Sequence, residues 1–283
     1  MMLLSWVRPF VSLGVCMVLG LAGLSPALAD KAYVPERGQS GKDVIWIPTP
    51  KGLIDKMLAA AKVTSSDRLF DLGAGDGIIA ITAAKELGAQ SVGIEYNPQM
   101  ADYARRMVQE AGVSDKVRII TGDIFKEDFS SATVVTLYLL PDLNMRLRPT
   151  LLRMKPGTRV VSHAFTMGDW EADETMAHES ARGYLWVVPA SVEGEWMMTG
   201  MEGGPVRLNF QQVLQKIGGT LTRGASNMPM LGARLSGEEL HFQFIMTPER
   251  EVHRFSGKVS GSLITGMVTS PGGLLTPVQA RKR

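Results

Sequence analysis

A glycine-rich turn between two acidic residues is the part of this sequence whose residue types and spacing best predict chemistry. The turn is Gly73-Ala74-Gly75-Asp76-Gly77, and a short apolar run leads into it through Asp71. A helix-compatible segment follows, and a second apolar run ends on Glu95. A strand, a glycine turn, a helix and a parallel strand form the unit that holds nucleoside cofactors, because glycine lets the backbone approach the ligand closely. Glu95 is placed to accept hydrogen bonds from two ribose hydroxyls.

Asp71 discriminates between two cofactors. NAD-binding turns follow the pattern G-x-G-x-x-G, whereas the glycines alternate here and Asp71 adds a carboxylate beside the turn. A carboxylate suits a cofactor that carries an ammonium group and a sulfonium, and it is poorly placed beside a pyrophosphate. DLGAGDG followed by GIEYNP resembles the first two motifs of class I S-adenosylmethionine-dependent methyltransferases. The sequence therefore favours S-adenosylmethionine over NAD.

The elements that position this turn alternate between helix and strand. Pro50 is predicted to be the first residue of a helix that Thr49 caps, and Pro98 is predicted to begin another helix. Further strands are expected over residues 117–121, 132–140 and 158–165, with a last sheet strand over 184–189. Strands that alternate with helices through short loops predict an α/β fold with a doubly wound, mostly parallel sheet.

The resemblance becomes more specific over residues 38–173. VIWIPTP, DLGAGDG, GIEYNP, TVVTLYLLPDLN and LRPTLLRMKPGTRVVSHAF resemble a bacterial branch of one group of methyltransferases. That group contains the mitochondrial protein-lysine methyltransferases that act on the ATP synthase c-subunit and the adenine nucleotide translocase. The resemblance implies a protein lysine acceptor, including a membrane-embedded one. It also implies cofactor contacts at Asp71, Gly73, Gly75, Glu95 and Asp123, and an entry motif at Pro48-Thr49-Pro50. Further candidate cofactor-binding residues are Trp46, Pro48, Ala74, Tyr96 and Ile124.

One position departs from the group. The family usually has arginine after GDG, where this chain has Ile78. We interpret Ile78 as a surface change on the helix. Asp123, in GDIF, can accept a hydrogen bond from the adenine amino group, although a solvated turn aspartate also fits its position.

The acceptor side of the site is expected after the fourth strand. Enzymes that methylate nucleobase amines carry an Asn/Asp-Pro-Pro-aromatic turn there. This chain instead has Tyr138 followed by Leu-Leu-Pro-Asp, which argues against methylation of DNA adenine. Tyr138 and Asn144 are the nearest polar side chains, and either could instead support the loop. Tyr138 and Thr49 are the candidate catalytic residues. Methyl transfer needs alignment and a deprotonated acceptor more than an acid–base pair, so the lack of a catalytic triad does not argue against activity.

Two residue types count against a metal. The four histidines, His163, His178, His241 and His253, lack metal-ligand spacing and are interpreted as structural or solvent-facing. The single cysteine, Cys16, lies in the N-terminal apolar stretch. No metal site is therefore predicted.

The residues before the first helix allow two interpretations. Trp46 and Pro48 either pack against the sheet, or belong to a lid of residues 46–50 over the cofactor and the acceptor. The sequence does not decide between these two.

The N-terminus and the overall composition address location and partners. Residues 1–29 resemble a signal peptide with Arg8, an apolar stretch and Ala27-Leu28-Ala29 before Asp30, although an uncleaved membrane anchor fits too. We expect export to the periplasm or association with the inner membrane, with the domain on the cytoplasmic face if the segment is retained. The formal net charge of +2 on 283 residues disfavours nucleic acid as a partner. The oligomeric state is left open.

The chain changes character after the predicted sheet. Residues 191–283 are glycine-rich with alternating apolar positions, which predicts a small antiparallel meander or barrel of about six to eight strands. The expected organisation is thus a leader (1–29), a cofactor-binding methyltransferase domain (30–190) and a β-rich module (191–283). Two functions remain: an active methyltransferase, or a cell-envelope binding protein with a non-catalytic methyltransferase fold. The presence of both acids, Asp71 and Glu95, favours the active methyltransferase.

Overall fold

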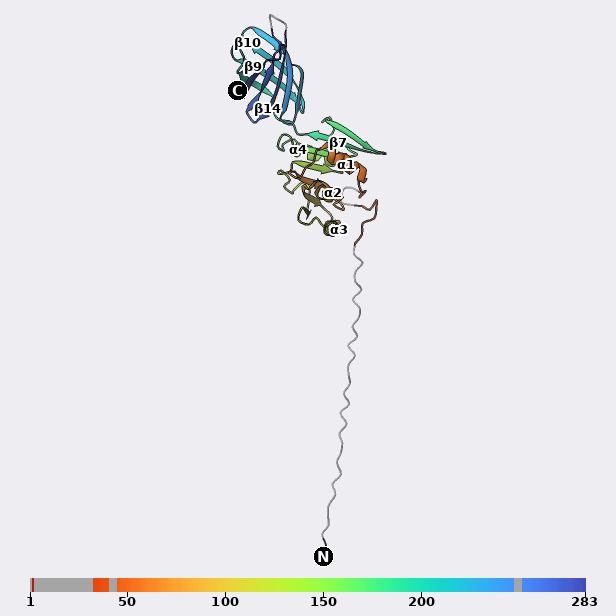
Figure 1. Cartoon of the computed structure of the whole chain (residues 1–283). Helices are drawn as coiled ribbons and strands as arrows, with labels where there is room; N and C mark the ends of the chain where they lie inside the picture. The colour runs from red at the N-terminus through yellow and green to blue at the C-terminus, as the bar shows by residue number, and fades with distance from the viewer. Residues whose placement is uncertain (1, 3–32, 41–44, 247–250) are drawn as a thin grey trace. The chain divides into compact units, whose positions relative to one another are not determined.

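A computed structural model describes residues 2, 33–40, 45–246 and 251–283 of the chain (Figure 1). Residues 33–283 form one compact unit. The predicted signal peptide, residues 1–29, lies outside the described residues apart from Met2. The compact unit contains two β-sheets, and each has its own apolar core.

The first sheet holds the glycine-rich turn and has seven strands in the order β3-β2-β1-β4-β5-β7-β6. The strands are β1 (Arg68–Leu72), β2 (Gln90–Glu95), β3 (Val117–Thr121), β4 (Val134–Leu137), β5 (Arg159–His163), β6 (Glu174–His178) and β7 (Ala181–Val187). The first five pair in parallel, while β7 pairs antiparallel with both β5 and β6. The chain order reverses at β1, and ligands of doubly wound sheets bind beside such a switch point.

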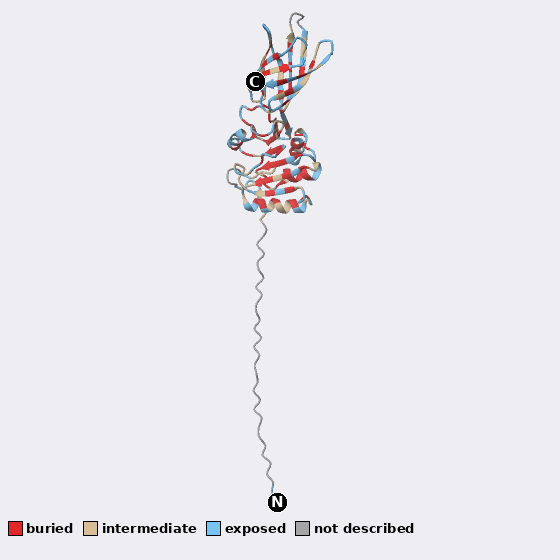
Figure 2. Ribbon diagram, turned by 90° about the vertical axis from the view of Figure 1, so that its left-hand side faces the viewer, coloured by how far each residue is buried: buried red, intermediate tan, exposed pale blue. Residues whose placement is uncertain are grey.

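Helices cover both faces of this sheet. They are α1 (Lys51–Ala60), α2 (Ile78–Leu87), α3 (Pro98–Glu110) and α4 (Pro141–Leu151). Successive strand residues point to opposite faces: Val134 packs in the cluster that contains α1, and Val135 packs in the cluster that contains α4. α2 and α3 share a further cluster over Val117 and Ile119. The doubly wound sheet is therefore as predicted, and buried residues follow its strands (Figure 2).

The predicted element boundaries differ from the observed ones at the end of the sheet. β3 covers the predicted residues, whereas β4 and β5 are shorter than predicted because residues beyond Leu137 and His163 leave the ladder. The last sheet strand is β7 rather than residues 184–189, and β6 was not predicted. β6 has one buried residue in five, so its composition carries little apolar signal.

The second sheet has nine antiparallel strands, more than the six to eight predicted. They are β8 (Gly194–Thr199), β9 (Val206–Val213), β10 (Lys216–Arg223), β11 (Ser226–Pro229), β12 (Leu231–Ser236), β13 (Glu239–Met246), β14 (Glu251–Ser260), β15 (Leu263–Thr269) and β16 (Leu275–Lys282). The edge strands β11 and β12 are consecutive in the chain, separated by Met230, and β10 contacts β12. The sheet is therefore nearly closed.

Aromatic side chains fill the core of the second sheet. The rings of Phe242 and Phe255 stack with their centroids 4.7 Å apart, and Phe210 meets Phe242 edge-on at 6.1 Å. Trp196 is fully buried, and its indole N–H donates to the carbonyl of Val192 at 2.6 Å. A buried indole that is hydrogen-bonded in this way adds apolar area without leaving an unsatisfied donor.

Candidate active site

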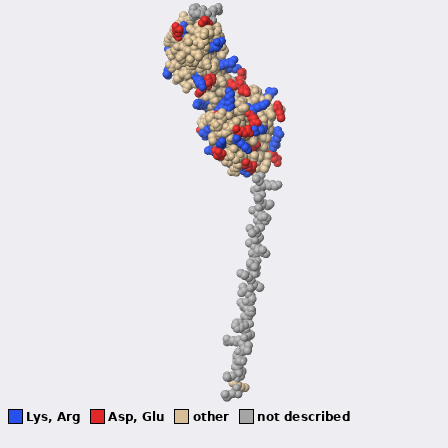
Figure 3. All heavy atoms as spheres, viewed as in Figure 1, with Lys and Arg blue, Asp and Glu red and all other residues tan. Residues whose placement is uncertain are grey.

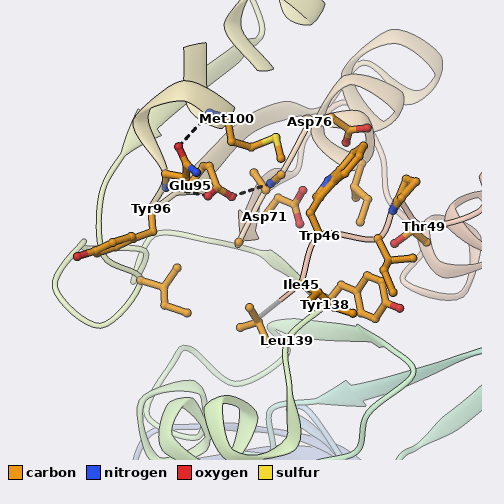
Figure 4. A pocket seen from close by; sticks show the side chains of 18 of the residues that line it. Ile45, Trp46, Thr49, Asp71, Asp76, Glu95, Tyr96, Met100, Tyr138 and Leu139 are labelled. Carbon is orange, nitrogen blue, oxygen red and sulfur yellow. Dashed lines mark hydrogen bonds between the residues drawn. The ribbon is translucent and has the colours of Figure 1, made fainter. Parts of the chain in front are cut away.

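A cavity of about 250 Å³ opens at the carboxyl ends of β1, β2 and β4 (Figure 4). It is lined by every residue that the sequence predicts for the site. These are Trp46, Pro48, Thr49, Asp71, Gly73, Ala74, Gly75, Glu95, Tyr96, Asp123, Ile124 and Tyr138. Glu95 and Tyr96 lie on one side of it, and Thr49 and Tyr138 lie on the other (Figure 4).

Two glycines in the turn after β1 allow neighbouring side chains of the cavity wall to pack closely against the backbone. Gly73 and Gly75 have φ of +80° and +55°, in the left-handed region that glycine tolerates best. A Cβ on Gly75 would lie 2.8 Å from the indole nitrogen of Trp46, and one on Gly73 would lie 2.8 Å from the Leu139 side chain. Any larger residue at either position would therefore displace the wall or close the cavity.

Glu95 ties the glycine turn to the start of α3. Its Oε2 accepts a hydrogen bond from the Gly75 N–H at 2.9 Å, and its Oε1 accepts one from the Asn97 N–H at 2.9 Å. The Asn97 side chain then caps α3 by accepting from Gln99 and Met100. Burial raises the pKa of Glu95, and the two backbone hydrogen bonds oppose this shift. The carboxylate is thus fixed in orientation at the cavity wall.

Asp71 lies at the base of the cavity and is 3% exposed. The hydroxyl of Thr136 on β4 donates to Asp71 Oδ1 at 2.7 Å. Burial, with the nearby charges of Asp76 and Glu95, raises the pKa of Asp71 to about 7. Three carboxyl groups with raised pKa values line one cavity, so the site favours a positively charged ligand, which would stabilise their ionised forms.

The turn after β3 contributes one polar and two apolar side chains to the cavity wall. Asp123 Oδ1 accepts a hydrogen bond from the Phe125 N–H at 3.0 Å, which fixes the turn. Ile124 and Phe125 line the cavity beside it, and Tyr96 also lines it. Apolar surfaces beside one carboxylate suit a flat heterocycle that carries an amino group.

Residues before α1 form part of the cavity wall. The backbone of Trp46 pairs with Gln39 and Gly38, so that residues 38–40 and 45–46 run antiparallel. Arg106 on α3 donates to the carbonyl of Tyr33 at 2.6 Å and holds the beginning of this segment. The indole of Trp46 lies against Gly75, and Trp46, Pro48 and Thr49 all line the cavity.

Thr49 does not cap α1, contrary to the prediction. Pro50 is the N-cap residue, and no side chain caps this helix. The Thr49 hydroxyl instead lies 3.0 Å from Nδ1 of His163, which is 114 positions away in the chain. This distant partner satisfies the buried hydroxyl in place of a local cap.

The interpretation of Ile78 as a surface change is also wrong. Ile78 is half-buried, lines the cavity and packs against the cluster that contains α1. Its place at the start of α2, directly after the glycine turn, brings it to the cavity wall.

His163 and Asn144 are polar residues that the fold buries behind the acceptor side. His163 ends β5, and its ring centroid lies 3.8 Å from that of Tyr138, so it is structural rather than solvent-facing. Spacing along the chain gave no signal for its place at the site, because its partners come from distant elements. Asn144 supports the loop: its amide approaches the carbonyls of Phe165 and Thr166 at 3.4 Å.

The described part of the chain has neither a metal cluster nor a membrane-spanning helix. No group of three or more His, Cys, Asp or Glu side chains there could hold a metal ion. Within the same residues, no helix is long and apolar enough to cross a membrane.

The fold and the cavity define a Rossmann-like, S-adenosylmethionine-dependent methyltransferase, and comparisons with known proteins agree. The profile of the ANTKMT methyltransferase domain matches residues 71–174. An RNA methyltransferase from Salinibacter ruber, whose crystal structure contains S-adenosyl-L-homocysteine, has 50% sequence identity to this chain over the matched region. The match covers 52% of this chain and 96% of that one, with a TM-score of 0.51.

Curated relatives of this chain include protein-lysine N-methyltransferases. A protein-lysine N-methyltransferase of Saccharolobus islandicus is 39% identical over 163 residues, which are 56% of this chain and 97% of the relative. The human lysine N-methyltransferase of the ATP synthase c-subunit is 32% identical over 126 residues, and the chain spans about half of that relative's length, 52%. The chain belongs to the methyltransferase family represented by the Saccharolobus enzyme. Its cofactor is S-adenosylmethionine, as the sequence predicted.

Proposed function

We propose that this enzyme methylates the side-chain amine of lysine in a protein. The observation that carries the proposal is the cavity itself. A glycine-rich turn and three carboxyl groups with raised pKa values, of which Asp71 is buried, line one side, and an apolar wall with one phenol, Tyr138, lines the other. Relatives named as protein-lysine N-methyltransferases support the choice of acceptor.

The residues present fit the cofactor. Asp71 and Asp76 would face its positively charged groups, Glu95 its ribose hydroxyls, and Asp123 its adenine amino group. When bound, S-adenosylmethionine supplies a methyl group on a positively charged sulfur. Glycine at position 75 lets the Trp46 indole pack closely against the turn, because a Cβ there would lie 2.8 Å from the indole nitrogen.

The acceptor side of the cavity suits a neutral amine. Leu139, Leu140, Leu143 and Phe165 line the cavity together with Tyr138 there. Apolar surroundings disfavour the charged form of an amine and so lower its pKa. A lysine side chain that enters this region would lose its proton more readily than in water, and only the neutral amine has the lone pair that methylation requires.

RNA is the second candidate acceptor, because the Salinibacter relative is described as an RNA methyltransferase. RNA binding normally needs clustered basic side chains along the path of the phosphates. On the face shown in Figure 3, Lys and Arg side chains are interspersed with Asp and Glu. Three exposed residues that line the cavity are apolar or aromatic, with Ile45 56%, Tyr96 50% and Leu140 42% exposed. A protein acceptor fits this rim better.

The apolar rim also supports a finer proposal about the acceptor. Ile45 and Leu140 would contact the chain on either side of the target lysine. We propose that this lysine lies in an apolar segment, such as the end of a membrane-embedded helix. Burying the Ile45 and Leu140 side chains would contribute favourable free energy of docking, at roughly 25 cal/mol per Å² of apolar surface.

Transfer to lysine is directly measurable. The full-length protein is incubated with methyl-labelled S-adenosylmethionine and, in parallel, with envelope extract or with total RNA. We expect label on lysine in the envelope sample, identified by mass spectrometry after digestion, and much less label with the Glu95→Ala variant at a cofactor concentration below saturation. Label confined to RNA would overturn the lysine assignment. No label in either sample, together with intact cofactor binding, would favour the non-catalytic envelope-binding alternative.

We further propose that the enzyme is exported or held at the inner membrane. We also propose that residues 191–283 are an accessory module to the methyltransferase domain of residues 30–190. The support for export is Arg8, the apolar stretch and the Ala27-Leu28-Ala29 site in the sequence. The expected result is a mature N-terminus at Asp30 in the periplasmic fraction, measured by mass spectrometry of fractionated cells. Intact Met1 in protease-shielded membranes would contradict export and favour a retained anchor.

A further inference from the structure

We propose that His163 is a positioning residue that, through its hydrogen bond to Thr49, holds the ring of Tyr138 in place at the acceptor side of the cavity. The inference rests on the proposed function, since it assigns how the acceptor wall of that site is built. It adds to the site a residue that does not itself line the cavity.

The contacts form a continuous chain from the segment before α1 to the end of β4. The Thr49 hydroxyl lies 3.0 Å from His163 Nδ1, and the two residues are 8% and 5% exposed. The His163 ring in turn lies against the Tyr138 ring, with centroids 3.8 Å apart and planes inclined by 31°. Thr49 and Tyr138 both line the cavity, so His163 lies behind the wall that they form.

The backbone after His163 is held in an unfavourable conformation. Ala164 has φ of +67°, and the Phe165 N–H donates to the His163 carbonyl at 2.9 Å, which makes a three-residue turn. A residue with a Cβ is disfavoured in this region, so neighbouring contacts must stabilise the turn. The Ala164 N–H donates to the Arg182 carbonyl on β7 at 2.8 Å.

This turn places two rings around Tyr138. His163 precedes Ala164 and Phe165 follows it, and the Phe165 ring centroid lies 6.5 Å from that of Tyr138 with planes inclined by 29°. Among the described residues, the Tyr138 hydroxyl has no hydrogen-bond partner. Tyr138 is therefore located by ring contacts, and its hydroxyl is left available to the acceptor.

The chemistry of His163 fits a positioning role better than a proton-accepting role. Burial lowers its pKa to about 4, so the imidazole is neutral across the physiological range and is a weak base. A neutral imidazole has one nitrogen that accepts and one that donates, and Thr49 engages Nδ1. Because Thr49 follows Trp46 and Pro48, the same hydrogen bond also anchors the segment that lies over Gly75.

Paired variants test the hydrogen bond. Thr49→Val removes the hydroxyl with nearly the same shape, His163→Phe keeps a ring against Tyr138, and Thr49→Ser restores a hydroxyl. We expect Thr49→Val and His163→Phe each to lower methyl incorporation into lysine of the envelope extract at least tenfold, with the dissociation constant of S-adenosylhomocysteine changed less than threefold. Thr49→Ser should recover most of the activity. The double variant should lose little more than either single one, because both remove the same interaction.

A readout without an acceptor separates this inference from the proposed function. The chain has five tyrosines, so fluorotyrosine-labelled protein gives a short ¹⁹F spectrum in which the Tyr138→Phe variant identifies the Tyr138 signal. We expect Thr49→Val to shift or broaden that signal and to leave the Tyr103 signal unchanged. An unchanged Tyr138 signal, or full activity in Thr49→Val, would overturn the positioning role. A shifted signal in a protein that methylates no lysine would contradict the proposed function alone.

Discussion

Glu95→Ala is expected to weaken the binding of S-adenosylmethionine roughly 10- to 100-fold, or about 1–3 kcal/mol, the scale of hydrogen bonds lost from a charged group. The carboxylate would meet the ribose hydroxyls, and it also orients the Gly75 and Asn97 N–H groups at 2.9 Å each. Its removal therefore costs ligand contacts and loosens the turn. Titration calorimetry of the full-length variant with S-adenosylhomocysteine measures the change directly.

Two variants control this experiment. Glu110→Ala removes an exposed acid at the end of α3 and should leave the affinity unchanged. Glu95→Gln keeps the size and one acceptor oxygen, and should fall between the wild type and alanine. Wild-type affinity in Glu95→Ala would mean that the ribose is held elsewhere, and would reject the assignment of this acid.

Asp71→Asn is expected to stabilise the free enzyme and to weaken its hold on the cofactor. The pKa of Asp71 is about 7 in the folded chain and near 3.8 in the unfolded chain. The folded state therefore binds more protons between these values, and the free energy of unfolding contributed by this group falls as pH rises from about 4 to 7. Asparagine does not ionise, so the Asp71→Asn variant avoids this decrease in the free energy of unfolding. The decrease amounts to about 4 kcal/mol at most for a pKa shift of this size. The measurement is the melting temperature at pH 8, where the variant should exceed the wild type.

Cofactor affinity should show the opposite preference. A positively charged ligand favours the ionised Asp71, so wild-type binding should strengthen as pH rises toward 7, by up to about tenfold per pH unit. Asp71→Asn should bind more weakly at pH 8 and with a shallower pH dependence, part of which Asp76 and Glu95 retain. The amide oxygen of the introduced asparagine can still accept the Thr136 hydroxyl, so a destabilised variant would contradict the argument.

The sequence by itself determined the cofactor half of the site. Asp71, Gly73, Gly75 and Glu95 lie within 25 positions of one another, and a strand, a tight turn, a helix and a parallel strand leave one arrangement for them. Local constraints of this kind are readable because glycine at positive φ and an acid at a strand end each have a narrow physical purpose. The alternation of strands and helices also determined the doubly wound sheet.

Only the tertiary structure decided which side chains come together on the proposed acceptor side. The sequence predicted that Thr49 caps α1, but its hydroxyl hydrogen-bonds His163 instead. A buried hydroxyl needs a hydrogen-bond partner, and packing places His163 next to it. His163 and Tyr138 meet because β4 and β5 are neighbours in the sheet, a pairing that no spacing along the chain reveals. Ile78 became part of the cavity wall for the same reason: exposure is a property of what the fold places nearby, not of a residue's place on its own helix.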